Sequence, residues 1–327
     1  MNSDKILITG ATGFIGGHLA EALIKDHHVK ALVRETSNTK SLEKLGIELV
    51  YGDLRNLDSL KKAIYDVGIV YHLAEAKGSP QKAYEIDVKA TRALIDYSQS
   101  AGVTRFVYAS TVAVMGRSQE TPLDESRQYN PYPFFFHALA KCECEKYGFD
   151  KFKEEKFPFV AIRPSGIYGG NCPYINFIFE WMRKHPLLGV PVLGNGKNTM
   201  HFAHIDDIVK AFELAGERKE AIGNAYIIVD DCPISWNEFL EATANSLHIK
   251  LRLRRIPVLP IMLLGGFIES ISKLMGNPIV IKPVLYFFTD NVSYSNFKAK
   301  HDLGFKPKYP DPIKGLEKEM KLCKNKE

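Results

Sequence analysis

Apolar residues gather in short runs along the chain, and between these runs they recur at helical spacing. Short runs without polar alternation indicate strands buried on both faces, and a period of about 3.6 residues indicates amphipathic helices. The predicted strands are Lys5–Thr9, Val29–Val33, Glu48–Tyr51, Ile69–Leu73, Arg105–Ala109, Phe159–Arg163 and Tyr226–Val229. The predicted helices include Ile15–Lys25, Asp58–Tyr65, Tyr84–Ala101, Ala138–Lys153 and Asp207–Glu217. This alternation predicts an α/β fold, a doubly wound parallel Rossmann sheet with helices on both faces.

The domain organisation follows from where this pattern stops and resumes. The 327 residues are enough for a large core and a second lobe, and no low-complexity linker or internal repeat divides them. After Gly196 a helix and a buried strand return, so the chain is expected to rejoin the sheet. We therefore predict a dinucleotide-binding domain from residues 1–170 and 201–232. Residues 171–200 and 233–327 are predicted to form a smaller C-terminal substrate-binding lobe.

A glycine-rich turn joins the first strand to the first helix, with Gly10, Gly13 and Gly16 three residues apart. Gly10 permits a tight turn, Gly13 lets backbone amides approach a pyrophosphate, and Gly16 allows the helix to pack closely on the strand. The N–H groups of the first helical turn then face the phosphates. The residues predicted to contact a dinucleotide here are Gly10, Thr12, Gly13, Phe14, Ile15 and Gly16.

The tip of the second strand indicates which nicotinamide nucleotide binds. An acidic side chain there accepts from the ribose 2′-hydroxyl of NAD(H), whereas arginine pairs with the 2′-phosphate of NADP(H). Arg34 stands at this tip with Lys40 nearby, so NADP(H) is the predicted cofactor. The alternative is that Glu35 takes the ribose of NAD(H). Asp53 and Leu54 follow the third strand, where Asp53 is predicted to accept from the adenine amino group.

Further motifs follow in order along the chain. Leu73 and Ala74 end the fourth strand, where small residues let the cofactor's ribose and phosphates lie against the backbone. The chain as a whole resembles the extended short-chain dehydrogenase/reductase family, which includes nucleotide-sugar epimerases and dehydratases, dihydroflavonol reductase-like enzymes and 3β-hydroxysteroid dehydrogenases. The segments that carry the resemblance are Gly10–Gly16, Tyr108–Gly116, Arg163–Gly169, Gly194–Gly196, His201–Asp207 and Ser295–Pro307.

The resemblance implies roles for three residues. Thr111, five residues before Gly116, stands where the family has its catalytic Ser or Thr. Lys141 stands where the family has the lysine that binds the ribose, since Arg163 follows at the family's spacing. Pro164 belongs to the segment that the family places beside the nicotinamide.

The family's Tyr-x-x-x-Lys pattern is broken, because His137 and not tyrosine stands four residues before Lys141. In that pattern the phenol exchanges a proton with the substrate oxygen, and the lysine one helical turn on lowers its pKa. Tyr147 and Lys151 do satisfy the pattern. They lie too close to Arg163 for the usual helix and turn, so we do not assign them the role.

Three interpretations of this substitution stay open at the level of the sequence. His137 itself is the acid/base, since imidazole relays protons near neutral pH. Alternatively, Tyr132 from the preceding loop supplies the phenol, or Thr111 acts with water. In the third interpretation, the site has lost redox chemistry and the chain is a catalytically silent NADP(H)-binding regulator.

The substrate is expected to be a mostly apolar secondary alcohol or ketone, which would make the chain an NADP(H)-dependent oxidoreductase. Met200 stands where nucleotide-sugar enzymes of the family carry a diphosphate-binding arginine, and its apolar side chain removes that contact. The apolar stretch Ile256–Ile268 is expected to form a loop and helix that line the substrate pocket. A nucleotide-sugar epimerase or dehydratase is the alternative enzyme.

Composition narrows the possible partners and the compartment. The formal net charge of +5 comes without a basic and aromatic module, so no nucleic acid is expected. The five cysteines lack metal-ligand or redox spacing, which predicts reduced thiols in a cytoplasmic protein and no metal. We expect no signal peptide and no transmembrane segment. Peripheral membrane contact through Ile256–Ile268, helped by Arg252, Arg254 and Arg255, is the alternative role of that stretch. A homodimer is expected by analogy with the family.

Overall fold

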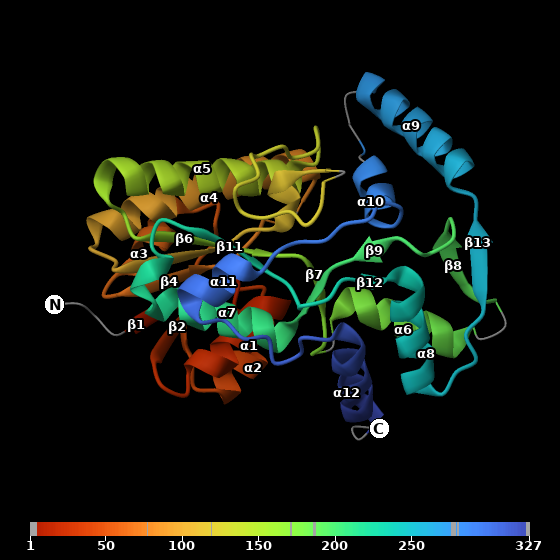
Figure 1. Cartoon of the computed structure of the whole chain (residues 1–327). Coiled ribbons are helices and arrows are strands. Elements are labelled where there is room, and N and C mark those ends of the chain that lie inside the picture. Colours follow the sequence, from red (N-terminus) through yellow and green to blue (C-terminus); the bar gives the residue numbers. More distant parts are fainter. Residues whose placement is uncertain are drawn as a thin grey trace.

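The computed structural model describes residues 5–324 apart from Lys77, Gln119, Asn171, 186–187, 276–278 and Val280. Within this part, seven parallel strands form one sheet in the order β11-β6-β5-β4-β1-β2-β3 (Figure 1). The strands are β1 (Lys5–Thr9), β2 (His28–Val33), β3 (Glu48–Tyr51), β4 (Ile69–His72), β5 (Arg105–Ala109), β6 (Phe159–Pro164) and β11 (Ala225–Ile228). Every predicted strand is present with its ends within one residue of the prediction. The doubly wound α/β fold is therefore confirmed.

Helices cover both faces of this sheet. On one face lie α1 (Phe14–Leu23), α2 (Lys40–Lys44), α7 (Ile205–Glu217) and α11 (Phe297–Leu303). On the other lie α3 (Leu57–Ile64), α4 (Pro80–Ser100) and α5 (Phe136–Glu155). Side chains along β1 alternate between the two cores, with Ile6 and Ile8 in the first and Leu7 in the second. Because strand side chains point alternately to opposite faces, a continuous apolar run supplies both cores.

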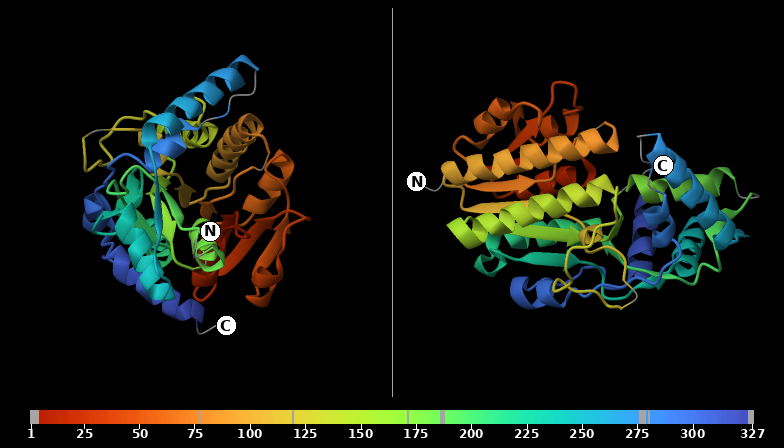
Figure 2. Two further views of the ribbon diagram at one scale, coloured as in Figure 1. Left: turned by 90° about the vertical axis from the view of Figure 1, so that its right-hand side faces the viewer. Right: turned by 90° about the horizontal axis from the view of Figure 1, so that it is seen from above.

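The remaining elements form a second body beside the sheet, seen next to it in Figure 1 and in the right view of Figure 2. They are β7 (Gly166–Tyr168), α6 (Pro173–Lys184), β8 (Val190–Leu193), β9 (Thr199–Met200), β10 (Phe202–His204), β12 (Ile234–Ser235), α8 (Trp236–Leu247), β13 (Leu253–Ile256), α9 (Val258–Leu274), α10 (Lys282–Phe287) and α12 (Pro312–Lys324). Its core includes Phe202, Trp236, Phe239 and Leu316. Strand β7 pairs with β10 where the chain passes between the two bodies.

Helix α11 corrects one part of the predicted domain division. We expected residues 233–327 to belong entirely to the substrate lobe. Ala299 and Leu303 of α11, followed by Phe305, are instead buried in the core between the sheet and α7. These apolar side chains pack over β11 and bury that end of the sheet. The local pattern of the sequence does not reveal this packing.

Candidate active site

The predicted cofactor residues lie at one edge of the sheet, because the carboxyl ends of parallel strands meet there. From β3 to β6, the carboxyl ends of the strands carry these residues in order: Asp53 and Leu54 after β3, Arg34 after β2, the glycine turn after β1, Leu73 and Ala74 after β4, Thr111 after β5, and Pro164 at the end of β6. The strand order reverses between β1 and β4, and doubly wound sheets bind ligands at such a point.

The turn between β1 and α1 depends on close approach of backbone to backbone. Gly10 has a φ of +79°, and a Cβ there would lie 2.7 Å from the nitrogen of Ala74. A Cβ on Gly16 would lie 2.2 Å from the carbonyl oxygen of Gly10. Helix α1 begins at Phe14, after Gly13 at its N-cap, with no side-chain cap and no acidic residue in its first turn. Its first N–H groups are therefore available to an anion, and the turn fits the diphosphate of a dinucleotide.

The residues predicted to meet the adenosine end are accessible. Arg34 directly follows β2, Lys40 begins α2, and both are exposed. Arg55 donates to both carboxylate oxygens of Asp53, at 2.8 and 2.7 Å. This pairing, rather than the more distant Arg34, is the main reason that the pKa of Asp53 falls to about 2. Asp53 is therefore a carboxylate that can only accept hydrogen bonds.

Lys141 is buried on α5 with its ammonium group directed at the sheet edge. Its Nζ donates to the carbonyl oxygen of Ala109 at 2.7 Å and lies 4.9 Å from the centre of the Tyr108 ring. A third partner is Glu75, whose Oε1 lies 2.8 Å from Nζ. The lysine is thus held at the ends of β4 and β5, beside the positions predicted for the ribose.

His137 lies in the first turn of α5, one helical turn before Lys141, as the spacing predicted. Its side chain is 42% exposed, and its Nδ1 lies 3.5 Å from Oε1 of Glu75. One carboxylate oxygen therefore faces both the imidazole and the ammonium group. Glu75 was not among the residues predicted from the sequence. The available signal was an acidic residue directly after Leu73 and Ala74, where small residues were expected.

The charges around this cluster set the protonation of its members. Burial lowers the pKa of His137, the Glu75 carboxylate opposes this shift, and the Lys141 ammonium adds to it. The net result is a pKa below the usual value, so the neutral imidazole is favoured at neutral pH. For Glu75, burial raises the pKa, but Lys141 and His137 outweigh it, and the pKa lies below the usual range.

Asp87 of α4 is a second acidic group near Lys141. Its Oδ1 accepts from the backbone nitrogen of Ala76 at 2.6 Å. Burial, opposed by this hydrogen bond and by Lys141, raises the pKa of Asp87 to about 6. Asp87 thus supports the loop after β4 that carries Glu75.

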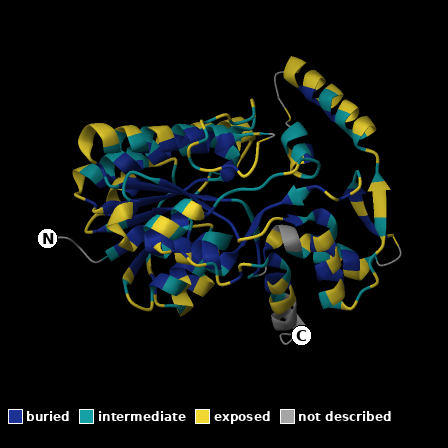
Figure 3. Ribbon diagram, viewed as in Figure 1, coloured by how far each residue is buried: buried dark blue, intermediate teal, exposed yellow. Residues whose placement is uncertain are grey.

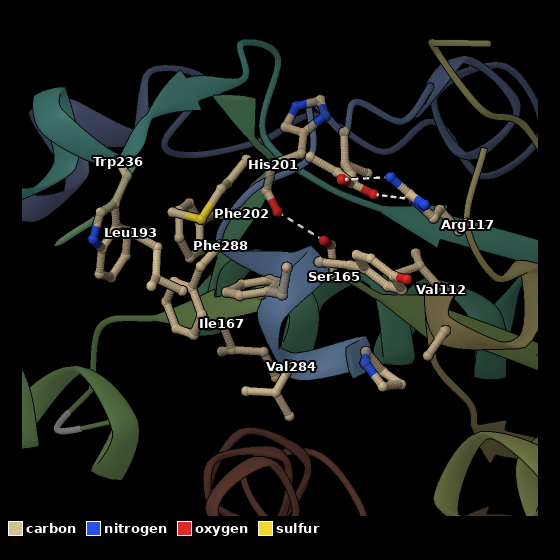
Figure 4. A pocket seen from close by; sticks show the side chains of 18 of the residues that line it. Val112, Arg117, Ser165, Ile167, Leu193, His201, Phe202, Trp236, Val284 and Phe288 are labelled. Atoms are coloured by element: carbon tan, nitrogen blue, oxygen red, sulfur yellow. Dashed lines mark hydrogen bonds and ion pairs between the residues drawn. The ribbon is translucent and has the colours of Figure 1, made fainter. Parts of the chain in front are cut away.

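A pocket of about 970 Å³ opens beside the sheet edge, between the two bodies (Figure 4). Thr111 and Tyr132 line it, whereas His137 and Lys141 are not among its lining residues. The hydroxyl of Thr111 accepts from the backbone nitrogen of Ala113 at 3.2 Å and caps the 3₁₀ turn Val112–Met115. Of the residues predicted to be catalytic, Thr111 and Tyr132 are therefore in contact with the pocket, while His137 and Lys141 lie outside its wall.

The walls of the pocket are largely apolar. Its apolar lining includes Ile167, Leu193, Met200, Phe202, Trp236 and Phe288. Two polar pairs interrupt these walls and are both drawn in Figure 4. Arg117 donates to Asp290, with Nη2 3.0 Å from Oδ1, and Ser165 Oγ donates to the carbonyl oxygen of His201 at 2.7 Å. The space accommodates an apolar molecule with few polar groups.

The structure also places the stretch Ile256–Ile268 and the side chain of Tyr147. Of the stretch Ile256–Ile268, which we expected to line the pocket, only Ile256 does so. Helix α9 carries the rest away from the pocket. Tyr147 donates to Asp96 of α4 at 2.7 Å, so its phenol is engaged on the helix layer and not at the sheet edge.

Comparison with known proteins agrees with this geometry. A family model described as the NAD dependent epimerase/dehydratase family matches residues 6–229. A 3-beta-hydroxysteroid dehydrogenase from Mycolicibacterium neoaurum is 28% identical, over 93% of this chain and 87% of that protein. A 4-hydroxy-2-methyl-3-oxo-4-farnesyl-3,4-dihydroquinoline-1-oxide ketoreductase from Stigmatella aurantiaca is 22% identical, over 92% and 91%. The structure of a UDP-glucose 4-epimerase from Thermotoga maritima superposes with a TM-score of 0.78 at 20% identity, over 98% and 99%.

Proposed function

The chain belongs to the NAD dependent epimerase/dehydratase family, and within it we propose an NADP(H)-dependent oxidoreductase that acts on a secondary alcohol or ketone of a mostly apolar small molecule. The family resemblance inferred from the motifs is thereby confirmed, and the chain is an NAD(P)-dependent enzyme of the short-chain dehydrogenase/reductase type. The preference for NADP(H) and the substrate class are the proposal.

The single observation that carries the proposal is the apolar pocket of about 970 Å³ with Thr111 in its wall. Apolar walls stabilise an apolar ligand by removing its surface from water. The hydroxyl of Thr111 lies two residues after the end of β5, at the carboxyl ends of the strands. A substrate in this pocket would hydrogen-bond Thr111 through its oxygen while its apolar body lies against residues such as Phe202 and Phe288.

The residues at the sheet edge would hold the dinucleotide. The glycine turn and the start of α1 would take the diphosphate, Lys141 the ribose beside the nicotinamide, and Pro164 would lie next to that ring. Arg34, with Lys40, would pair with the 2′-phosphate, which is why NADP(H) is favoured over NAD(H). When bound, the nicotinamide supplies or accepts the hydride.

His137 is proposed as the group that exchanges the proton of the substrate oxygen. Reduction of a ketone needs a proton donor, and oxidation of the alcohol needs an acceptor. An imidazole with a lowered pKa holds its proton weakly and so gives it up readily. Glu75 is proposed as a positioning residue, because its carboxylate faces both His137 and Lys141. The alternative donor is Tyr132, which lines the pocket directly.

A nucleotide-sugar substrate is the alternative that the pocket disfavours. Met200 is buried and lines the pocket in β9, at the place where the resemblance expects an arginine for the diphosphate. An apolar side chain at this point offers no charge-assisted hydrogen bond to a diphosphate.

The test follows NADPH oxidation spectroscopically with a panel of apolar cyclic and open-chain ketones, and runs a parallel panel of UDP- and dTDP-sugars. We expect turnover of at least one apolar ketone and no conversion or thermal stabilisation by the sugars. Conversion of a nucleotide sugar would refute the proposed substrate class. NADPH binding without turnover of any carbonyl would favour the silent regulator over the oxidoreductase. The homodimer and the cytoplasmic location stay predictions.

A further inference from the structure

Helix α9 has the reverse of the usual orientation of a surface helix. An amphipathic helix of a globular protein turns its apolar stripe to the core and its polar residues to water. In α9 the buried residues are Gly265, Glu269 and Ser272. Large apolar side chains face outward instead, and Leu274 is 88% exposed. These side chains, called the apolar ridge below, are Leu259, Leu263, Leu264, Phe267, Ile271 and Leu274.

The inner face of α9 is held by close packing and by hydrogen bonds. A Cβ on Gly265 would lie 3.2 Å from side-chain atoms of both Ile281 and Leu285, so the glycine lets α9 approach α10. Oε1 of the buried Glu269 accepts from the backbone nitrogens of Ile281 and Lys282, both at 2.7 Å. This orientation is therefore specified by its contacts, and the outward position of the apolar ridge follows from it.

The apolar ridge lies at the outer margin of the molecule. Figure 3 shows α9 at the upper right, largely exposed along its length, at the outer side of the second body. A contiguous apolar surface of this kind on a soluble protein marks a contact with another apolar phase or partner. A helix of 17 residues is about 25 Å long. No helix in the described residues has the length and apolarity to cross a membrane.

In the segment that carries the apolar ridge, the outward-facing charges have one sign. Between residues 250 and 289 the sequence has six Lys and Arg residues and a single acidic residue, Glu269. That carboxylate is buried beneath α9 and bonded to the backbone, so it does not face outward. Arg252 and Arg254 are exposed just before the helix, and Lys273 is exposed at its end. An apolar face flanked by cations is complementary to an anionic lipid surface.

The elements on either side of α9 reach the rim of the pocket. Ile256, two residues before α9, lines the pocket, and so do Val284 and Phe287 of α10, on which α9 packs. Val284 is 53% and Phe287 42% exposed, so these side chains belong both to the pocket and to the outer surface. Exposed apolar side chains are therefore present at the pocket rim as well as on the neighbouring α9.

We propose that the apolar ridge of α9 is a docking surface for an anionic lipid bilayer, in which the ridge lies in the interface and the flanking cations contact the headgroups. The helix lies on the membrane and does not span it. The proposal concerns the surface alone and does not depend on which substrate the pocket takes.

A second copy of the chain is a less suitable occupant. A two-fold contact of one ridge with another places each patch opposite itself. The cations beside the ridge would then face identical cations, with no outward acidic residue between 250 and 289 to compensate them. Like charges at short range disfavour such a pairing.

The experiment is flotation of the full chain with vesicles, comparing phosphatidylcholine alone with a mixture of phosphatidylcholine and phosphatidylserine. We expect binding to the anionic vesicles that weakens as the salt concentration rises, and weaker binding to neutral vesicles. The variant Leu263→Gln/Phe267→Gln should bind at least about tenfold more weakly, since it removes two large apolar groups from the lipid contact. Arg252→Gln/Arg254→Gln should lose the preference for anionic lipid.

The matched control is Tyr65→Gln, which removes a side chain that is 79% exposed at the end of α3. It should leave vesicle binding unchanged. Circular dichroism and NADPH binding identical to the unsubstituted protein would show that the ridge variants fold. Vesicle binding that is absent, or unaffected by the ridge variants, would overturn the proposal. Concentration-dependent dimerisation abolished by Leu263→Gln/Phe267→Gln, without vesicle binding, would identify a second copy as the occupant and equally overturn it.

Discussion

The carboxylate of Glu75 lies 2.8 Å from the ammonium group of Lys141, so the loop after β4 and the helix α5 are joined by an ion pair at the candidate active site. The same oxygen lies 3.5 Å from Nδ1 of His137. Lys141 is therefore not the only charge that affects the pKa of His137. The carboxylate opposes it, and the protonation of the imidazole depends on both charges.

Glu75→Gln should shift the pH dependence of the reaction to lower pH. The Glu75 carboxylate raises the pKa of His137, against burial and Lys141. Without it the imidazolium is less favoured and the pKa of His137 falls further. Because ketone reduction needs the protonated imidazole, the rate falls as pH rises through this pKa, and in the variant it falls at lower pH. The profile of kcat/KM against pH measures the shift. Glu21→Gln, an exposed position on α1, is the control, and coincident profiles for Glu75→Gln and the unsubstituted protein would refute the role of Glu75.

His137→Ala should lower kcat by about 10²–10⁴-fold, which is the usual contribution of a positioned acid or base. NADPH affinity should stay close to that of the unsubstituted protein, because the ribose contact is assigned to Lys141. Tyr132→Phe is the matched variant, since it removes only a hydroxyl from the other candidate. A severe loss in Tyr132→Phe with a mild one in His137→Ala would transfer the role to Tyr132.

Arg34→Ala should remove the preference for NADPH. A charge-assisted hydrogen bond contributes about 1.5–3 kcal/mol, so NADPH should bind at least about tenfold more tightly than NADH before the substitution and nearly equally after it. Isothermal titration calorimetry with both nucleotides measures the difference. A preference for NADH that Arg34→Ala leaves unchanged would show that Glu35 takes the ribose of NAD(H).

Gly16→Ala should impair the glycine turn, whereas Gly17→Ala should not. A Cβ on Gly16 would lie 2.2 Å from the carbonyl oxygen of Gly10, but on Gly17 the nearest contact is an ordinary 3.5 Å from the oxygen of Ala11. Gly16→Ala should therefore lower both the melting temperature and NADPH affinity. Gly17→Ala should raise the stability by about 1 kcal/mol, the usual difference between glycine and alanine inside a helix. Equal tolerance of the two substitutions would contradict the close packing at Gly16.

Asp230→Asn should change how stability depends on pH. Burial is the main cause that raises the pKa of Asp230 to about 8, whereas an unfolded aspartate has a pKa of about 3.9. Between these values the folded state holds a proton that the unfolded state has lost, so the free energy of unfolding falls as pH rises from about 4 to about 8. Asparagine does not titrate, so the free energy of unfolding of Asp230→Asn should not fall in this way. Relative to the unsubstituted protein, the variant should become more stable as pH rises from about 4 to about 8, which chemical denaturation at several pH values measures.

The neighbouring Asp231 provides the opposite control. Hydrogen bonds to Lys300 and Asn296 outweigh its desolvation and lower its pKa, so its contribution to stability is present at neutral pH and lost as pH falls. Asp231→Asn should therefore lose stability relative to the unsubstituted protein above about pH 4. A parallel response of Asp230→Asn and Asp231→Asn would contradict the opposed pKa shifts.

The sequence by itself determined the α/β class, the strands and the order of the site motifs. These depend on local spacing. The apolar residues Ile6–Ile8 at the centre of β1 are buried between two layers, and the turn that follows has a backbone geometry that only glycine adopts without strain. His137 and Lys141 lie one helical turn apart on α5 for the same local reason.

Other features depended on contacts between segments far apart in the chain. Glu75 joins His137 and Lys141 because the end of β4 lies beside α5, and α11 completes the cover of β11 from near the end of the chain. The orientation of α9 was likewise not readable, because its residues are apolar on several sides and local periodicity does not say which side packs. Only the contacts of Gly265 and Glu269 with α10 decided that the apolar ridge faces outward.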